Sequence, residues 1–125
     1  MIIEIPITPR SKKNSQNIVI NKKTNRLMVV QNKVYTQYEK DCKEYMPKLD
    51  KPIDYPINLK CNYYVGDARA RDIVNFIEAT QDILVKYKVL KDDNYNIVAS
   101  LDGSSMQIDR EKPHCIIEIT KKEVN

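Results

Sequence analysis

Acidic side chains recur along one part of the sequence at a spacing that suits binding of a divalent cation. Between residues 72 and 87 apolar residues follow a helical period. At about 100° per residue, the polar residues between them fall within a sector of about 120° on the opposite face. These polar residues are Asp72, Asn75, Glu78, Asp82 and Lys86. Hard oxygen ligands of this kind, without histidine or cysteine nearby, favour Mg²⁺ or Mn²⁺ over zinc.

Two further carboxylates, Asp92 and Asp93, follow in a predicted turn. If this turn folds back beside the next strand, they approach Asp72 and Glu78. A metal ion held by a few carboxylates can activate water and stabilise the charge that develops in phosphodiester hydrolysis. Ordinary structural roles account for the same residues equally well. An aspartate before a helix is a good N-cap, adjacent aspartates are common in turns, and many acidic helix faces are simply solvated.

Positive charge is concentrated near the N-terminus. The chain has a net charge of +4, and residues 10 to 33 contain basic residues but no acidic ones. Proteins that bind polyanions carry such a stripe, because each neutralised phosphate releases condensed counterions. A solvated loop that keeps the protein soluble has the same composition, so both interpretations stay open. The basic residues are Arg10, Lys12, Lys13, Lys22, Lys23, Arg26 and Lys33.

Composition excludes several classes of protein. With 125 residues, 42% of them hydrophobic and 30% charged, the chain suits one globular domain rather than a disordered or low-complexity protein. No apolar run approaches the about 20 residues of a membrane span, and residues 1–6 do not resemble a signal peptide. We therefore expect a cytoplasmic protein. Cys42, Cys61 and Cys115 are widely spaced, so we expect reduced, buried thiols rather than disulfides or a zinc site.

The pattern of apolar residues predicts an α+β fold, with a mixed β-sheet and two main helices packed on it. We expect a single domain over residues 1–125. The second and third strands surround a turn at residues 21–25, which predicts a β-hairpin with lysines at its tip. Strands are predicted at 2–8, 17–20, 26–30, 57–65, 95–101 and 115–121, and helices at 35–46 and 72–87.

The sequence from Arg69 to Val98 resembles the RusA family of Holliday-junction resolvases, which are found in bacteria and their prophages. The resemblance consists of an arginine-rich segment, an aspartate and an asparagine at Asp72 and Asn75, an Asp-x-Leu later in the helix, and a closing pair of aspartates. The N-terminal segment 9–15 is also similar to the opening of many members. The resemblance therefore extends over nearly the whole chain.

The resemblance implies a RusA-like endodeoxyribonuclease that resolves Holliday junctions in recombination and repair. Such a protein acts as a homodimer on four-way or branched DNA, with Mg²⁺ or Mn²⁺ and no small-molecule cofactor, in a bacterial cell and in some cases encoded by a phage. It implies that Asp72, Asp92 and Asp93 are catalytic and that Asp72 and Asp93 bind the metal. The residues expected to contact DNA are Arg10, Lys12, Lys13, Lys22, Lys23, Arg69 and Arg71.

Two positions depart from the family pattern. Val74 occupies the place of the second aspartate, and Glu78 occupies the place of a catalytic lysine. Because Val74 and Glu78 are one helical turn apart, we hypothesise that Glu78 supplies the missing catalytic and metal-binding carboxylate. The alternative is a non-catalytic protein that still binds junctions. Arg69, Arg71 or Lys91 are the candidates to replace the positive charge of the missing lysine.

Overall fold

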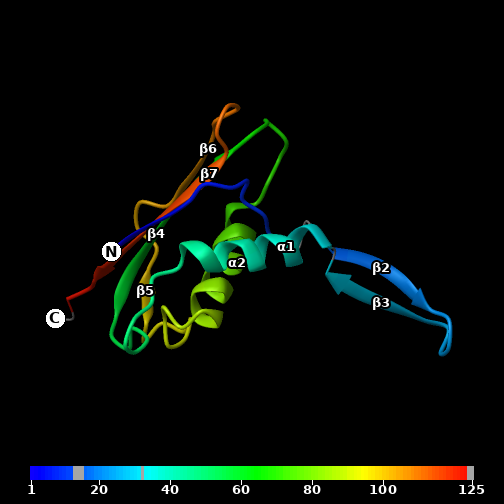
Figure 1. Ribbon diagram of the computed structural model, residues 1–125, viewed down its shortest axis with the longest axis horizontal. Helices are drawn as coiled ribbons and strands as arrows, with labels where there is room; N and C mark the ends of the chain where they lie inside the picture. The colour runs from blue at the N-terminus through cyan, green and yellow to red at the C-terminus, as the bar shows by residue number, and fades with distance from the viewer. Residues whose placement is uncertain (13–15, 32, 124–125) are drawn as a thin grey trace.

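A mixed β-sheet with two helices on one face forms the body of the protein, which confirms the predicted α+β fold (Figure 1). The computed structural model describes residues 1–12, 16–31 and 33–123. The predicted DNA contact Lys13 lies outside these residues. The five-stranded sheet has the order β1-β7-β4-β5, and β6 also pairs with β4. Its strands are β1 (Ile2–Ile5), β4 (Ile57–Val65), β5 (Val98–Ser100), β6 (Ser105–Ile108) and β7 (His114–Lys121).

One edge of β4 is occupied by two short strands instead of one. β5 pairs in parallel with the beginning of β4, and β6 pairs in parallel with its end. The predicted strand at 95–101 is therefore longer than the observed one, and β6 was not predicted because its sequence is short and half polar. Asn58 of β4 holds the chain between β5 and β6. Its Oδ1 accepts hydrogen bonds from Ser100 Oγ (2.6 Å) and the Asp102 backbone N–H (2.8 Å).

The two helices lie close to their predicted positions. Helix α1 (Lys33–Cys42) continues into a short 3-10 helix, η2 (Lys43–Tyr45), and α2 spans Ile73–Lys86. Asp72 is the N-cap of α2, and its Oδ1 accepts a hydrogen bond from the Val74 backbone N–H at 3.0 Å. The structural role suggested by its residue type is thus confirmed.

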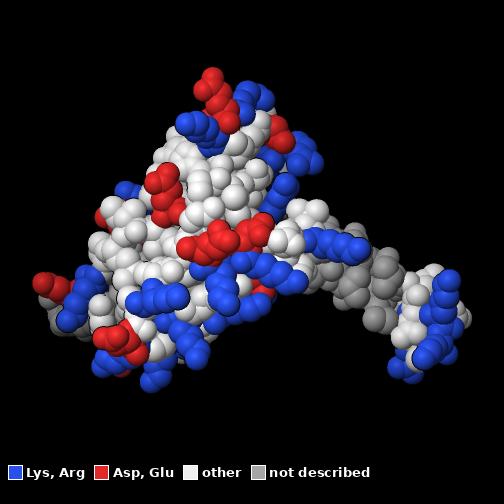
Figure 2. All heavy atoms as spheres, in the orientation of Figure 1, with Lys and Arg blue, Asp and Glu red and all other residues white. Residues whose placement is uncertain are grey.

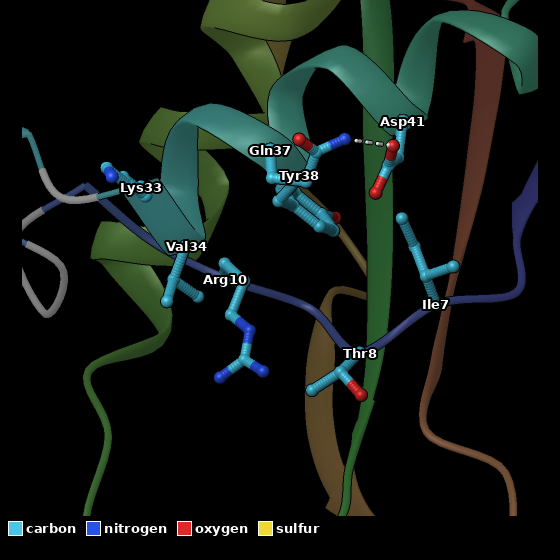
Figure 3. Close-up of a pocket in the computed structure, with 8 residues that line it drawn as sticks. All are labelled: Ile7, Thr8, Arg10, Lys33, Val34, Gln37, Tyr38 and Asp41. Atoms are coloured by element: carbon cyan, nitrogen blue, oxygen red, sulfur yellow. Dashed lines mark hydrogen bonds between the residues drawn. The ribbon is translucent and has the colours of Figure 1, made fainter.

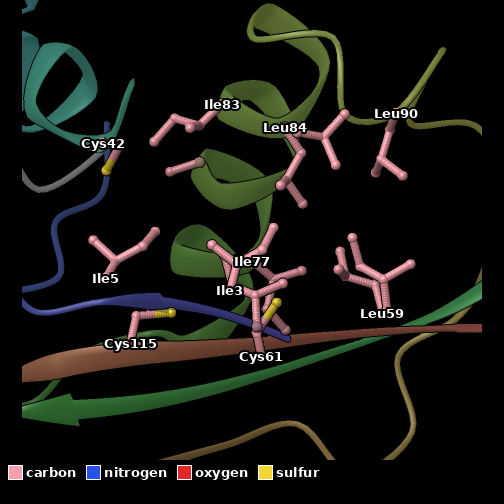
Figure 4. Close-up of a cluster of buried hydrophobic side chains, with 14 of the residues drawn as sticks. Ile3, Ile5, Cys42, Leu59, Cys61, Ile77, Ile83, Leu84, Leu90 and Cys115 are labelled. Atoms are coloured by element: carbon pink, nitrogen blue, oxygen red, sulfur yellow. The ribbon is translucent and has the colours of Figure 1, made fainter. Parts of the chain in front are cut away.

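The core lies between the sheet and the helices (Figure 4). Alternating residues of β1, β4 and β7 face the apolar sides of α1 and α2, as the period of two in each strand predicts. The three cysteines are free and fully buried within this core, which confirms the expectation. Burial raises the pKa of Cys42 and of Cys61 to about 12 and raises that of Cys115 as well. These thiols therefore remain protonated and unreactive near neutral pH.

The predicted hairpin is confirmed and extends away from the body (Figure 1). Strands β2 (Gln16–Asn21) and β3 (Arg26–Gln31) pair antiparallel as a separate two-stranded sheet. Lys22 and Lys23 lie in the turn that joins them, as predicted. Among the described helices, none is long and apolar enough to cross a membrane.

A buried hydrogen-bonded pair joins the sheet to α2 and yields a stability prediction. The Tyr63 hydroxyl lies 2.6 Å from Thr80 Oγ1, which itself donates to the Phe76 carbonyl at 3.0 Å. We expect Thr80→Val to lower the free energy of unfolding by about 1–3 kcal/mol, because the Tyr63 hydroxyl loses its acceptor in the core. Urea unfolding measures this change. Thr80→Ser keeps the hydroxyl and serves as the control; equal losses for both variants would contradict the prediction.

Candidate functional site

Helix α2 separates the carboxylates that the sequence predicts to lie together. Asp72 precedes the first residue of this 14-residue helix, whereas Asp92 and Asp93 follow its last. The segment after α2 returns to the part of the chain just before β4, since Lys91 N–H donates to the Ile53 carbonyl at 3.0 Å. A helix of this length spans about 21 Å. The predicted convergence of Asp72 with Asp93 around one ion is therefore not favoured within a single chain, because α2 lies between them (Figure 1).

The same geometry places Glu78 nearer the Asp72 end than the Asp93 end. Glu78 is exposed in the middle of α2, and Val74, one turn earlier, is exposed as well. The hypothesis that Glu78 replaces a carboxylate lost at Val74 thus concerns the first half of the helix.

Two adjacent aspartates follow the C-terminal end of α2, within reach of the charge of Asp82. The Asp93 backbone N–H donates to Asp92 Oδ1 at 2.7 Å. Partial burial raises the pKa of the Asp93 carboxyl, and a hydrogen bond with Asp92 together with the charges of Asp92 and Asp82 raises it further. The anionic form of Asp93 is therefore disfavoured by its neighbours, which a bound cation would reverse.

Lys12 supplies a positive charge to this group. Its Nζ lies 2.7 Å from Asp82 Oδ2, and both side chains are half-buried. The same ammonium lies 5.9 Å from the centre of the Tyr35 ring. Lys12 was expected to contact DNA, but here it forms an ion pair across the polar face of α2. Beside it, Lys86 of α2 forms an ion pair with Glu39 of α1.

Arginines gather at the opposite, N-terminal end of α2. A pocket of about 180 Å³ is lined by Arg10, Arg69 and Arg71 together with the buried Ser11. Asp67 orients two of these arginines. Its Oδ1 lies 2.9 Å from Arg71 Nη2 and accepts the Arg69 backbone N–H at 3.0 Å.

The Arg71 guanidinium is further held by backbone carbonyls. Its Nη1 donates to the carbonyls of Asp67 and Arg69, each at 3.1 Å, and its side chain is only 13% exposed. The Arg69 backbone N–H lowers the pKa of the Asp67 carboxyl, and the Arg71 side chain lowers it too. Asp67 is therefore ionised at neutral pH and holds the Arg71 guanidinium, whereas the exposed Arg69 side chain lies 3.4 Å from it at Nε. An ordered cluster of this kind can hold phosphate oxygens.

Arg10 connects this pocket to the base of the hairpin. It also lines a second, larger hollow of about 520 Å³ between the N-terminal segment and α1, where Lys33 and Gln37 contribute further polar groups (Figure 3). Gln37 Nε2 donates to Asp41 Oδ1 at 2.7 Å on the same helix. Lys33 is the first residue of α1, which follows the hairpin in the chain.

Cationic side chains therefore form two groups, one around Arg10 near the start of α2 and the base of the hairpin and one at the hairpin tip. Figure 2 shows basic side chains on the part of the body that faces the hairpin and again at the far end of the hairpin. Lys22, Lys23 and Arg26 at the tip are all exposed. The two ends of α2 thus differ in charge: arginines surround its beginning, and aspartates follow its end.

The Asp92–Asp93 turn has too few carboxylates for a metal site built wholly from protein ligands. It suits Mg²⁺, which needs only one or two carboxylates. Within the described residues, no group of three or more histidine, cysteine, aspartate or glutamate side chains is arranged to hold a metal ion. Mg²⁺ commonly uses only one or two carboxylates, keeps several waters and takes substrate phosphate oxygens as further ligands. The adjacent carboxylates of Asp92 and Asp93, with Asp82 nearby, meet that smaller requirement.

The sequence did not point to Asp67 or Glu39, nor to the ion pair that Lys12 makes. Asp67 has a local signal, since it precedes Arg69 by two residues and Arg71 by four, within reach of both. Lys12 and Glu39 have no such signal, because their partners Asp82 and Lys86 are distant in the sequence. Only packing of the N-terminal segment and α1 against α2 brings them together.

Comparison of the chain with protein-family models gives no match, and comparison with curated proteins gives none.

Proposed function

We propose that this protein binds branched DNA as a RusA-like homodimer and cleaves it by metal-dependent phosphodiester hydrolysis. Its place would be the bacterial cytoplasm, in recombination and repair, encoded by the host or by a phage. The DNA-binding part of the proposal has the stronger structural support, and the cleavage part depends more on the resemblance of residues 69–98 to resolvases.

The observation that carries the proposal is a pair of cationic groups, one beside the start of α2 and one at the hairpin tip. Arg69 and Arg71 are oriented by Asp67 in a pocket, Arg10 lines both this pocket and the next, and the exposed hairpin tip adds Lys22 and Lys23. Oriented guanidinium groups suit phosphate oxygens, because their fork of donors matches the geometry of the anion. A surface that reads the backbone in this way recognises the shape of DNA more than its sequence.

Cleavage is assigned to the turn after α2. Asp92 and Asp93 would hold Mg²⁺ or Mn²⁺, which when bound lowers the pKa of water and neutralises charge on a phosphate. The positive charge of the missing motif lysine would have to come from another cation, and Lys12 is paired with Asp82 at 2.7 Å. Lys12 joins Lys91 as a candidate for that role, whereas Arg69 and Arg71 lie at the other end of α2.

A homodimer suits the proposed substrate. Closed two-fold symmetry presents two identical sites, and a four-way junction has two like strands to cut. In each chain the arginine pocket and the Asp92–Asp93 turn lie at opposite ends of α2, so one chain can bind backbone at a point distant from the carboxylates.

A second candidate function is junction binding without cleavage. It is favoured by the separation of Asp72 from Asp93 along α2, which leaves no described three-carboxylate centre in one chain. In this alternative Asp72 serves as the helix cap, and Lys12 neutralises Asp82.

The two candidates are separated by one assay. The protein is incubated with a synthetic four-way junction and with a linear duplex of equal length, in Mg²⁺, in Mn²⁺ and in chelator. Paired nicks on the junction that require metal support the nuclease. Salt-sensitive binding without nicks supports the binding protein, and absence of binding to either DNA contradicts both.

The positioning role of Asp67 is tested by a substitution whose two possible effects have opposite signs. Asp67→Ala adds positive charge, which alone strengthens binding of DNA, but it also releases Arg69 and Arg71. We expect junction binding to weaken by about three- to tenfold, because two side chains must then be ordered on binding. Fluorescence anisotropy measures the affinity, and Glu111→Ala, an exposed acid elsewhere, is the control. Tighter binding of Asp67→Ala would show that its charge matters more than its position.

A further inference from the structure

The hairpin tip carries an exposed apolar pair whose surroundings suggest a specific use. Ile20 and Leu27 are direct cross-strand partners in the antiparallel register of β2 and β3. Their exposed fractions are 61% and 74%. Side chains at directly opposed positions project from the same face of a hairpin, with Cβ atoms about 4.5–5.5 Å apart. They therefore form one apolar patch, whereas isolated exposed apolar residues require no explanation.

Positive charge borders this patch. Lys22, Lys23 and Arg26 lie between the two apolar residues in the chain, and all three are exposed. Residues 10–33 contain no aspartate or glutamate. An occupant of this surface must therefore combine an apolar interior with a negatively charged outside, which describes a nucleic-acid base stack between its phosphate backbones.

The turn holds these groups in a defined arrangement. The Asn25 backbone N–H donates to the Asn21 carbonyl at 2.7 Å, and the Lys23 backbone N–H donates to Asn21 Oδ1 at 3.0 Å. Asn25 adopts a positive φ of 55°, which asparagine tolerates better than most residues. The lysines thus project from an ordered turn next to the apolar pair.

We propose that Ile20 and Leu27 insert into a base step at the branch point of DNA, while Lys22, Lys23 and Arg26 hold the flanking phosphates. This inference rests on the proposed DNA-binding function. A two-stranded ribbon is narrow enough to enter a DNA groove, and apolar side chains inserted between bases are a known way to unstack them. Unstacking costs least where pairing or stacking is already interrupted. The wedge therefore favours branched DNA over a continuous duplex.

The test compares Ile20→Ser/Leu27→Ser with wild type and with Ile2→Ser/Ile108→Ser, a control that changes two exposed isoleucines on the body. Each protein is titrated onto a four-way junction that carries 2-aminopurine at the branch point, and onto a duplex of equal length. We expect wild type and control to raise the fluorescence of the probe. The hairpin variant should not raise it and should bind the junction about tenfold more weakly, with a change of less than about twofold on the duplex.

Other outcomes distinguish the failure of this inference from the failure of the proposed function. Equal losses on junction and duplex, or junction binding by wild type without a fluorescence rise, would overturn the wedge and leave DNA binding standing. If wild type binds neither DNA, the proposed function itself is wrong. The molar mass of each protein is measured by light scattering. A lower mass for the hairpin variant would assign the patch to contact between chains and overturn the wedge. Recovery of both signals by Ile20→Val/Leu27→Met would support it.

Discussion

Asp93→Asn is expected to slow metal-dependent cleavage of a four-way junction by at least about 10²- to 10³-fold, the usual effect of removing one group that stabilises a developing charge. Asparagine keeps the size of the side chain but loses the anion that would bind Mg²⁺. Junction affinity in chelator should be unchanged or slightly higher, because one negative charge is removed from a surface that faces phosphate. Single-turnover cleavage and anisotropy measure the two quantities.

The pKa of Asp93 predicts how this activity depends on pH. Its pKa is raised by partial burial and by Asp92 and Asp82, so protons compete with the metal at a higher pH than for an ordinary aspartate. The concentration of Mg²⁺ needed for half-maximal cleavage should therefore increase as the pH falls through the raised pKa. For the same reason the anion destabilises the fold above that pKa, so Asp93→Asn should raise Tm slightly at neutral pH and lose this advantage in acid.

Matched variants locate the metal site along α2. Asp102→Asn, at an exposed turn on the edge of the sheet, is the control and should cleave normally. If Asp93→Asn cleaves at the wild-type rate, the assignment to the Asp92–Asp93 turn is wrong. If Glu78→Gln and Asp72→Asn then lose cleavage, the catalytic centre lies at the other end of the helix. Wild-type cleavage by Glu78→Gln would instead contradict the hypothesis that Glu78 replaces the missing carboxylate.

The second large effect concerns salt. If all the cations proposed to contact phosphates do so, the logarithm of the observed association constant for a junction should fall against the logarithm of the salt concentration with a slope of about −5. The affinity should therefore drop about 10³-fold between about 50 and 200 mM salt. The cations that enter this sum are Arg10, Arg69, Arg71, Lys22, Lys23 and Arg26. Neutralising the last three with alanine should make the slope less steep by about 2–3 and weaken binding most at low salt.

A charge-matched control makes this prediction specific. Lys43→Ala/Lys48→Ala/Lys51→Ala removes three exposed lysines from the segment that follows α1. It produces the same change in net charge but should leave the slope nearly unaltered, because these lysines lie away from the proposed contact surface. Equal slopes for the two triple variants would show that DNA responds only to net charge and would remove the hairpin from the interface.

Much of the local structure follows from short-range patterns. Strand 57–65 is confirmed without change, and the helix predicted at 72–87 differs by one residue at each end. The capping role of Asp72 and the hairpin around residues 21–25 are also confirmed. Each of these depends on residues a few positions apart, whose spacing decides which face an apolar side chain occupies. The strand β6 has no such pattern; it forms because β4 offers a free edge beside it.

The candidate site likewise has features that short-range patterns predict and features that only packing decides. Residue types and charge alone pointed to the acidic face of α2, the aspartate turn and the basic N-terminal stretch. They could not say that a straight helix holds Asp72 apart from Asp93, or that Lys12 reaches Asp82 from 70 positions away in the chain. The relative positions of side chains within one element depend on residues that are close in the sequence. The distance between side chains at the two ends of an element depends on its length and on how the following segment packs. In this protein, packing of the turn after α2 against the segment just before β4 decided which carboxylates can meet.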